Sequence, residues 1–131
     1  MAEILVIDDD AQMRRLITRI LKSAGHHVRE ATDGSTGMKR FGEAQPALVV
    51  TDIFMPEKEG IETIRLLRQQ APDLPIIAIS GSGLKDYLHF AMQLGATAAL
   101  PKPFSADQLL QTVAQLVEDS TQQTISRQRQ R

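Results

Sequence analysis

Short apolar runs alternate with helical patterns along most of the chain. Three runs of β-branched and other apolar residues have the length of buried strands, namely Ile4–Ile7, Ala47–Thr51 and Pro75–Ile79. Two weaker strand candidates are His27–Thr32 and Thr97–Leu100. Strands that are apolar along their whole length are typical of a parallel sheet covered on both faces by helices. The pattern therefore predicts an α/β protein.

An amphipathic helix is predicted after each strand candidate. Apolar residues recur with helical spacing from Met13 to Ala24, and Gly25 stands where the C-terminus of a helix favours glycine. Ser35 is expected to cap the second helix, and a capping box at 105–108 is expected to begin the last one. The helix at 84–94 is expected to turn three side chains inward, those of Leu88, Ala91 and Met92. The third and last helices are marked by the apolar residues Ile61, Ile64, Leu67, Leu109, Leu110, Val113, Leu116 and Val117.

Five strand–helix units predict one doubly wound α/β domain over residues 1–118, with a five-stranded parallel sheet and five helices. The pattern alone does not fix the strand order, but five units suit the flavodoxin-like order 2-1-3-4-5 better than a six-stranded Rossmann order. Residues 119–131 are polar and contain one large apolar residue, Ile125. We expect a polar tail or a linker there, with extension of the last helix as the alternative.

Composition and charge narrow the class of protein. The chain has 131 residues, enough for one domain and little more. Its 15 basic and 16 acidic residues give a net charge of −1, so we expect no direct nucleic-acid binding. The absence of cysteine excludes disulfides and thiolate metal sites. The longest apolar run is far shorter than the ~20 residues of a membrane span, and the acidic N-terminus is unlike a signal peptide. We therefore expect a cytoplasmic protein with no membrane insertion.

Polar residues follow four of the predicted strands. Carboxylates follow the first and third strands, a hydroxyl the fourth and an amine the fifth; these residues are Asp8, Asp9, Asp10, Asp52, Ser80 and Lys102. Because the carboxyl ends of parallel strands meet at one edge of the sheet, we expect these side chains to converge. Clustered carboxylates repel one another and require a cation, and oxygen ligands without His or Cys select Mg²⁺ or a similar ion.

Asp52 is the natural nucleophile of such a site, because it stands alone after the central strand. An aspartyl phosphate is an established type of covalent intermediate. Lys102 would supply a second positive charge and Ser80 a neutral donor, which together with the ion would neutralise the oxygens of a phosphoryl group in transfer. These residues therefore favour phosphoryl transfer to Asp52.

With these motifs the chain resembles the receiver domain of bacterial two-component response regulators, of the single-domain type. The motifs are Ile4–Asp10, Asp52–Pro56 with Gly60, Ile76–Gly81, Gly95–Ala96 and Lys102–Phe104. The resemblance implies that Asp52 is the phosphoacceptor, that Ser80 hydrogen-bonds a phosphoryl oxygen, and that Lys102 pairs first with the carboxylate and then with the phosphoryl group. It also implies a cis peptide bond between Lys102 and Pro103.

The resemblance further implies a Mg²⁺ site beside Asp52. Asp9 would bind the ion directly and Asp8 largely through water, while Asp52 and the backbone carbonyl of Phe54 would complete the protein ligands. One departure from the family is Ala99, which stands where an aromatic residue usually turns inward on activation. A switch in this chain would then need another route.

The implied partners follow from the same resemblance. The phosphoryl donor would be a phosphohistidine on a sensor histidine kinase or a histidine phosphotransfer protein. The chain would not be an enzyme with a substrate of its own, although it would assist its own phosphorylation and autodephosphorylation and switch its partner-binding surface. The downstream target would be an unknown protein or an output domain missing from this sequence. Arg14, Arg15 and Arg19 are expected on the exposed face of the first helix, with docking to the kinase as a second interpretation.

Two alternatives remain open. Asp8 and Asp10 fit the nucleophile and the general acid of haloacid-dehalogenase-type phosphatases, with Ser80 and Lys102 as further motif residues. The lack of an acidic pair after Lys102, the short chain and the unused Asp52 count against that function. A pseudo-receiver that binds partners without phosphorylation is the second alternative, and the complete set of acidic, hydroxyl and amine residues counts against it.

Overall fold

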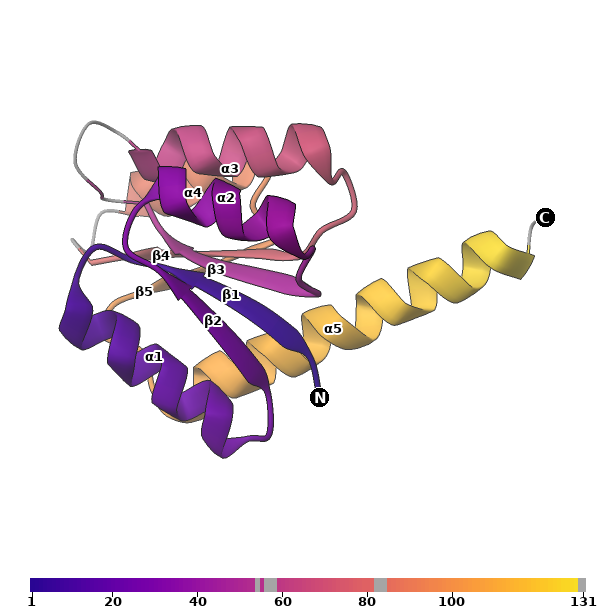
Figure 1. Ribbon diagram of the computed structural model, residues 1–131, viewed down its shortest axis with the longest axis horizontal. Helices are drawn as coiled ribbons and strands as arrows, with labels where there is room; N and C mark the ends of the chain where they lie inside the picture. The colour runs from indigo at the N-terminus through magenta and orange to yellow at the C-terminus, as the bar shows by residue number, and fades with distance from the viewer. Residues whose placement is uncertain (54, 56–58, 82–84, 130–131) are drawn as a thin grey trace.

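Five parallel strands form the centre of the computed structural model, which describes residues 1–53, 55, 59–81 and 85–129 (Figure 1). Their order across the sheet is β2-β1-β3-β4-β5, so the predicted doubly wound fold and its strand order are confirmed. The strands are β1 (Glu3–Ile7), β2 (His27–Ala31), β3 (Leu48–Asp52), β4 (Ile76–Ser80) and β5 (Ala98–Pro101).

Five helices cover the two faces of the sheet. Figure 1 shows α1 and α5 on one face and α2, α3 and α4 on the other. Their bounds are α1 (Ala11–Ser23), α2 (Gly34–Glu43), α3 (Glu59–Gln70), α4 (Lys85–Leu94) and α5 (Ala106–Arg129). No described helix is long and apolar enough to cross a membrane.

Alternate residues of the central strands fill two separate cores. Leu5 and Ile7 of β1 pack in the core under α2, α3 and α4, whereas Ile4 and Val6 pack in the core under α1 and α5. This alternation follows from the two-residue period of a strand. All residues of β3 and β4 are buried, while the edge strands β2 and β5 are mostly half-buried. The edge strands consequently gave the weaker apolar patterns.

Several predicted helix ends are confirmed. Gly25 follows α1 with a positive φ of 90°, a backbone conformation that glycine adopts without a steric penalty. At the start of α5, the Ser105 and Gln108 side chains each accept a hydrogen bond from the other's backbone N–H, at 3.0 and 2.8 Å. The prediction for α2 is wrong, because Asp33 and not Ser35 caps this helix. The Asp33 carboxylate accepts from the Thr36 N–H at 2.7 Å, and Ser35 lies inside the first turn.

Two further expectations concern α4 and the C-terminal residues. Ala91 is fully buried as predicted, but Met92 is 44% exposed, because the next residue along a helix points about 100° away. The side chain of Leu88 lies outside the described part of the structure. Residues 119–129 continue α5, which is the alternative to an irregular tail, and Figure 1 shows this part of the helix extending past the sheet. The domain boundary at residue 118 stays a prediction.

Candidate functional site

The topology brings the predicted polar residues to one edge of the sheet. Asp8 follows β1, and Asp52 ends the neighbouring strand β3, with Ile7 and Thr51 paired in register just before them. Ser80 ends β4 on the other side of β3, and Lys102 follows β5. The backbone N–H of Lys102 donates to the carbonyl of Ser80 at 2.8 Å, which fixes the end of β5 against the end of β4.

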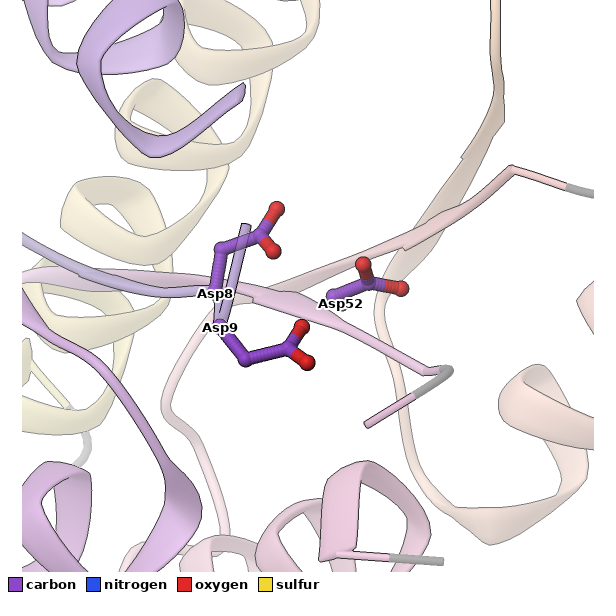
Figure 2. A group of neighbouring side chains, drawn as sticks. All are labelled: Asp8, Asp9 and Asp52. Atoms are coloured by element: carbon purple, nitrogen blue, oxygen red, sulfur yellow. The ribbon is translucent and has the colours of Figure 1, made fainter. Parts of the chain in front are cut away.

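Three carboxylates form a compact acidic cluster at this edge. One carboxylate oxygen from each of Asp8, Asp9 and Asp52 lies within 4.8 Å of the others. Figure 2 shows the three side chains near one another at the ends of β1 and β3. Asp8 and Asp52 are buried, whereas Asp9 is exposed. The acidic cluster is therefore largely buried and reaches solvent at Asp9.

Asp8 is the carboxyl group most strongly perturbed by this environment. Burial, with a smaller contribution from the negative charge of Asp52, raises the pKa of Asp8 to about 6. The backbone N–H of Asp10 donates to Asp8 Oδ1 at 2.9 Å and acts in the opposite direction. Asp8 Oδ2 is buried and has no hydrogen-bond partner among the described residues. A buried carboxylate oxygen in that state is costly, and a divalent cation would satisfy it.

Lys102 supplies positive charge to the cluster. Its Nζ lies 3.3 Å from Asp52 Oδ2, and both side chains are largely buried. The stem of Lys102 passes over Gly81, where the missing side chain leaves room for it. The peptide bond between Lys102 and Pro103 is cis, as the family resemblance implies. One ammonium group faces three carboxylates, so the site retains negative charge for a cation.

Ser80 offers a second unmatched polar atom. Its residue is 1% exposed, and its Oγ finds no hydrogen-bond partner within the described part of the chain. Most buried hydroxyl groups in proteins have a partner. Because β4 lies beside β3, this hydroxyl and the Asp52 carboxylate end neighbouring strands. The hydroxyl is consequently available to a ligand bound at Asp52.

The sequence analysis also singled out Asp10, Phe54 and Ala99. Asp10 accepts hydrogen bonds from the N–H groups of Gln12 and Met13 and caps α1. This capping occupies Asp10 and counts against a role as general acid in a phosphatase. The backbone carbonyl of Phe54, expected as a metal ligand, lies outside the described residues. Ala99 lies in β5, half-buried and paired with Ala78.

The sequence-based interpretation missed the contacts of Arg14 with the site, and it named Gly60 as a motif residue without assigning it a contact. Arg14 was expected on the exposed face of α1, but its guanidinium group donates to the carbonyl of Asp8 at 2.9 Å and pairs with Glu30. Gly60, in the first turn of α3, lies so close to β3 that an added Cβ would overlap the carbonyl oxygens of Asp52 and Ile53. The eight-residue spacing from Asp52 to Gly60 was the available signal for the second contact.

Comparison with known proteins matches the chain to one family. The family model described as "Response regulator receiver domain" matches residues 4–114. The chemotaxis protein CheY of Bacillus subtilis is 37% identical over 111 residues, which cover 84% of this chain and 92% of that protein. The DNA-binding transcriptional regulator NtrC of Azospirillum brasilense is 34% identical over 120 residues, or 92% of this chain but 25% of NtrC.

Solved structures show the same fold. The receiver domain of NtrX from Brucella abortus superimposes with a TM-score of 0.84 at 32% identity, covering 88% of this chain and 98% of that one. The longer NtrX chain gives a TM-score of 0.92 at 31% identity, and the match covers 97% of this chain and 29% of NtrX. The chain thus spans about the whole of some relatives and a quarter to a half of others, including the response regulator MprA of Mycolicibacterium vanbaalenii.

Proposed function

The chain belongs to the response regulator receiver family, and on that premise we propose that it accepts a phosphoryl group on Asp52 in a Mg²⁺-dependent reaction. The observation that carries the proposal is the convergence of Asp52 with two further carboxylates and with Lys102 at one edge of the sheet. Phosphorylation would then shift an equilibrium between two forms of the partner-binding surface.

Asp52 acts as the nucleophile in this reaction. A carboxylate oxygen of Asp52 forms a bond to the phosphorus of a phosphohistidine, the phosphorus–nitrogen bond breaks, and the released imidazole takes up a proton. The attacking carboxylate and the phosphoryl group are both negative, so the reaction needs positive charge at the site. Lys102 supplies part of that charge, since its Nζ lies 3.3 Å from Asp52 Oδ2. After transfer the same ammonium group would pair with the phosphoryl oxygens.

The acidic cluster would hold the ion. Asp8, Asp9 and Asp52 offer the hard oxygen donors that Mg²⁺ prefers. Asp8 Oδ2 has no partner among the described residues, which supports a cation there. When bound, Mg²⁺ would supply positive charge to the phosphoryl oxygens. The carbonyl of Phe54 stays a predicted further ligand. The Ser80 hydroxyl would donate to a phosphoryl oxygen, which gives this buried group the partner that the described residues do not provide.

The proposed partners come from the family. The donor would be a sensor histidine kinase or a histidine phosphotransfer protein, in the cytoplasm. The target would be a separate protein, as the match to nearly all of CheY suggests, or an output domain, as the longer NtrC suggests. We propose that the chain is a phosphoacceptor and not an enzyme with a separate substrate, although its own residues assist phosphorylation and autodephosphorylation.

Intact-protein mass spectrometry after incubation with acetyl phosphate and Mg²⁺ tests the proposal. Wild type should gain about 80 Da from one phosphoryl group, and Asp52→Asn should gain nothing. Asp10→Asn is the matched control, because Asn caps a helix as well as Asp does and the adduct should persist. An adduct on Asp52→Asn would contradict the proposal and favour the phosphatase alternative, and no adduct on wild type would favour a pseudo-receiver.

A further inference from the structure

We propose that Arg14 is a positioning residue for the acidic cluster, which holds the backbone at Asp8 and thereby sets the affinity of the site for its divalent cation. This inference rests on the metal site of the proposed function. Arg14 contacts no carboxylate of the cluster among the interactions described, so it would act through Asp8 and not on the ion itself.

The guanidinium group of Arg14 links two elements of the fold. From the first turns of α1, one terminal nitrogen donates to the carbonyl oxygen of Asp8 at 2.9 Å. The Nε atom donates to Glu30 Oε1 of β2 at 3.2 Å, and the Arg14 side chain is only 14% exposed. A guanidinium group is planar and presents its donors in a fixed fork, so the pairing with Glu30 orients the donor that meets Asp8.

Asp8 stands where the chain leaves the sheet, and its position decides whether the carboxylates converge. Its backbone N–H is held by the carbonyl of Ala31 at 3.1 Å, and Asp8 Oδ1 is held by the N–H of Asp10. Arg14 holds the carbonyl oxygen of Asp8, which belongs to the peptide bond between Asp8 and Asp9. The backbone that bears both carboxylates is consequently tied to β2, to α1 and to the following loop.

A purely electrostatic role and a positioning role of Arg14 predict opposite effects of its removal on the affinity for a cation. By Coulomb's law, loss of a positive charge beside an acidic cluster should make the cluster bind a cation more tightly. Loss of a group that orients metal ligands from outside the coordination sphere should weaken binding by roughly ten- to a hundredfold. The sign of the change therefore separates the two roles without any assay of phosphorylation.

The test is the dissociation constant of Mn²⁺ alone, measured by electron paramagnetic resonance on the full chain. Arg14→Gln should bind Mn²⁺ at least roughly tenfold more weakly than wild type. Arg14→Lys keeps the charge but loses the forked arrangement of donors, so its Mn²⁺ affinity should lie between those of wild type and Arg14→Gln. Arg15→Gln is the matched control, because Arg15 is the neighbouring exposed residue of the same helix, and its Mn²⁺ affinity should stay within about twofold.

Each outcome has a distinct meaning. Mn²⁺ binding by Arg14→Gln that equals or exceeds binding by Arg15→Gln would overturn the inference while leaving the metal site intact. A wild-type protein that binds no Mn²⁺ would overturn the metal site and, with it, the proposed function. Thermal unfolding without metal shows whether Arg14→Gln folds; if it does not, Glu30→Gln decides, because it weakens the pairing that orients Arg14. Glu30→Gln should also weaken Mn²⁺ binding, and unchanged binding would overturn the inference.

Discussion

The two ends of the sheet differ in whether their buried polar groups have hydrogen-bond partners among the described residues. At the carboxyl ends of the strands, Asp8 Oδ2 and Ser80 Oγ are buried without partners in the described structure, and the pKa of Asp8 is raised. At the amino ends, Arg68 of α3 donates to the carbonyl oxygens of Gly95, Ala71 and Pro72 at 2.7 to 3.0 Å. Thr97 Oγ1 accepts from the N–H of Ile76 at 3.0 Å.

This difference indicates that the amino ends of the strands contribute mainly to stability, whereas the carboxyl ends serve ligand binding. Satisfied polar groups at the amino ends tie α3 to the start of β5 and need nothing from outside the protein. Unsatisfied polar groups at the carboxyl ends lower stability in the absence of a ligand, and a bound ligand would offset this cost by supplying the missing interactions. Changes at the amino ends should therefore alter unfolding and leave cation binding alone, while changes at the carboxyl ends should alter both.

The largest loss of stability is expected from Gly60→Ala, which should displace the carboxyl end of β3 or the start of α3. An added Cβ would overlap the carbonyl oxygens of Asp52 and Ile53, so the end of β3 or the start of α3 must move. We expect a loss of about 3 kcal/mol in the free energy of unfolding, measured with urea, together with weaker Mg²⁺ binding. Gly42→Ala in α2 is the control, since no atom of the described residues lies within 4 Å of the new Cβ and a gain of about 0.5–1 kcal/mol is expected. Equal stability of the two variants would contradict the packing argument.

A substitution at the opposite end comes next in size. Arg68→Ala removes the donors to three backbone carbonyls and should lower the free energy of unfolding by about 2–3 kcal/mol. Mg²⁺ affinity, measured by calorimetry, should not change. Arg65→Ala on the same helix loses an exposed pair with Glu62 at 3.7 Å and should cost at most about 0.5 kcal/mol. A large drop in Mg²⁺ affinity for Arg68→Ala would show that the two ends are coupled.

Asp8→Asn should stabilise the metal-free protein, although it removes a site residue. Because burial raises the pKa of Asp8 to about 6, the carboxylate is held ionised at pH 7 at a cost, and the neutral amide avoids it. We expect a gain of about 2 kcal/mol in urea unfolding without metal, and no further gain when Mg²⁺ is added. Asp9→Asn, at an exposed position, should give a smaller metal-free gain. A metal-free Asp8→Asn protein less stable than wild type would contradict this view of the acidic end.

The smallest change from one measurement to the next is expected in the pH dependence of stability, which isolates the contribution of Asp8. A raised pKa means that folded Asp8 binds its proton more tightly than unfolded Asp8, so its contribution to metal-free stability is present below about pH 4 and is lost as the pH rises through about 6. The stability difference between wild type and Asp8→Asn should therefore change by about 1 kcal/mol per pH unit between those values. A difference that stays constant from pH 4 to pH 7 would place the pKa of Asp8 at its ordinary value.

Fold and site differ in how much of each the sequence predicts. Asp52, Ser80 and Lys102 were brought together by topology alone, because residues that end parallel strands must share an edge. The contacts of Arg14 were missed because a helical pattern does not fix how α1 rotates against β2. The cap of α2 was misassigned because Asp33 and Ser35 are both good capping residues two positions apart. The end of α5 extends past the sheet, so no apolar pattern marks it.

The most direct test of the contrast between the two ends is nuclear magnetic resonance with a small amount of Mn²⁺. A bound paramagnetic ion broadens the amide signals of nearby residues. We expect the signals of Asp8, Asp52 and Ser80 to broaden first, while those of Gly95 and Thr97 at the opposite end stay sharp. Broadening that begins at Gly95 and Thr97, or that affects both ends equally, would contradict the claim that the carboxyl ends of the strands are the ligand-binding end of this protein.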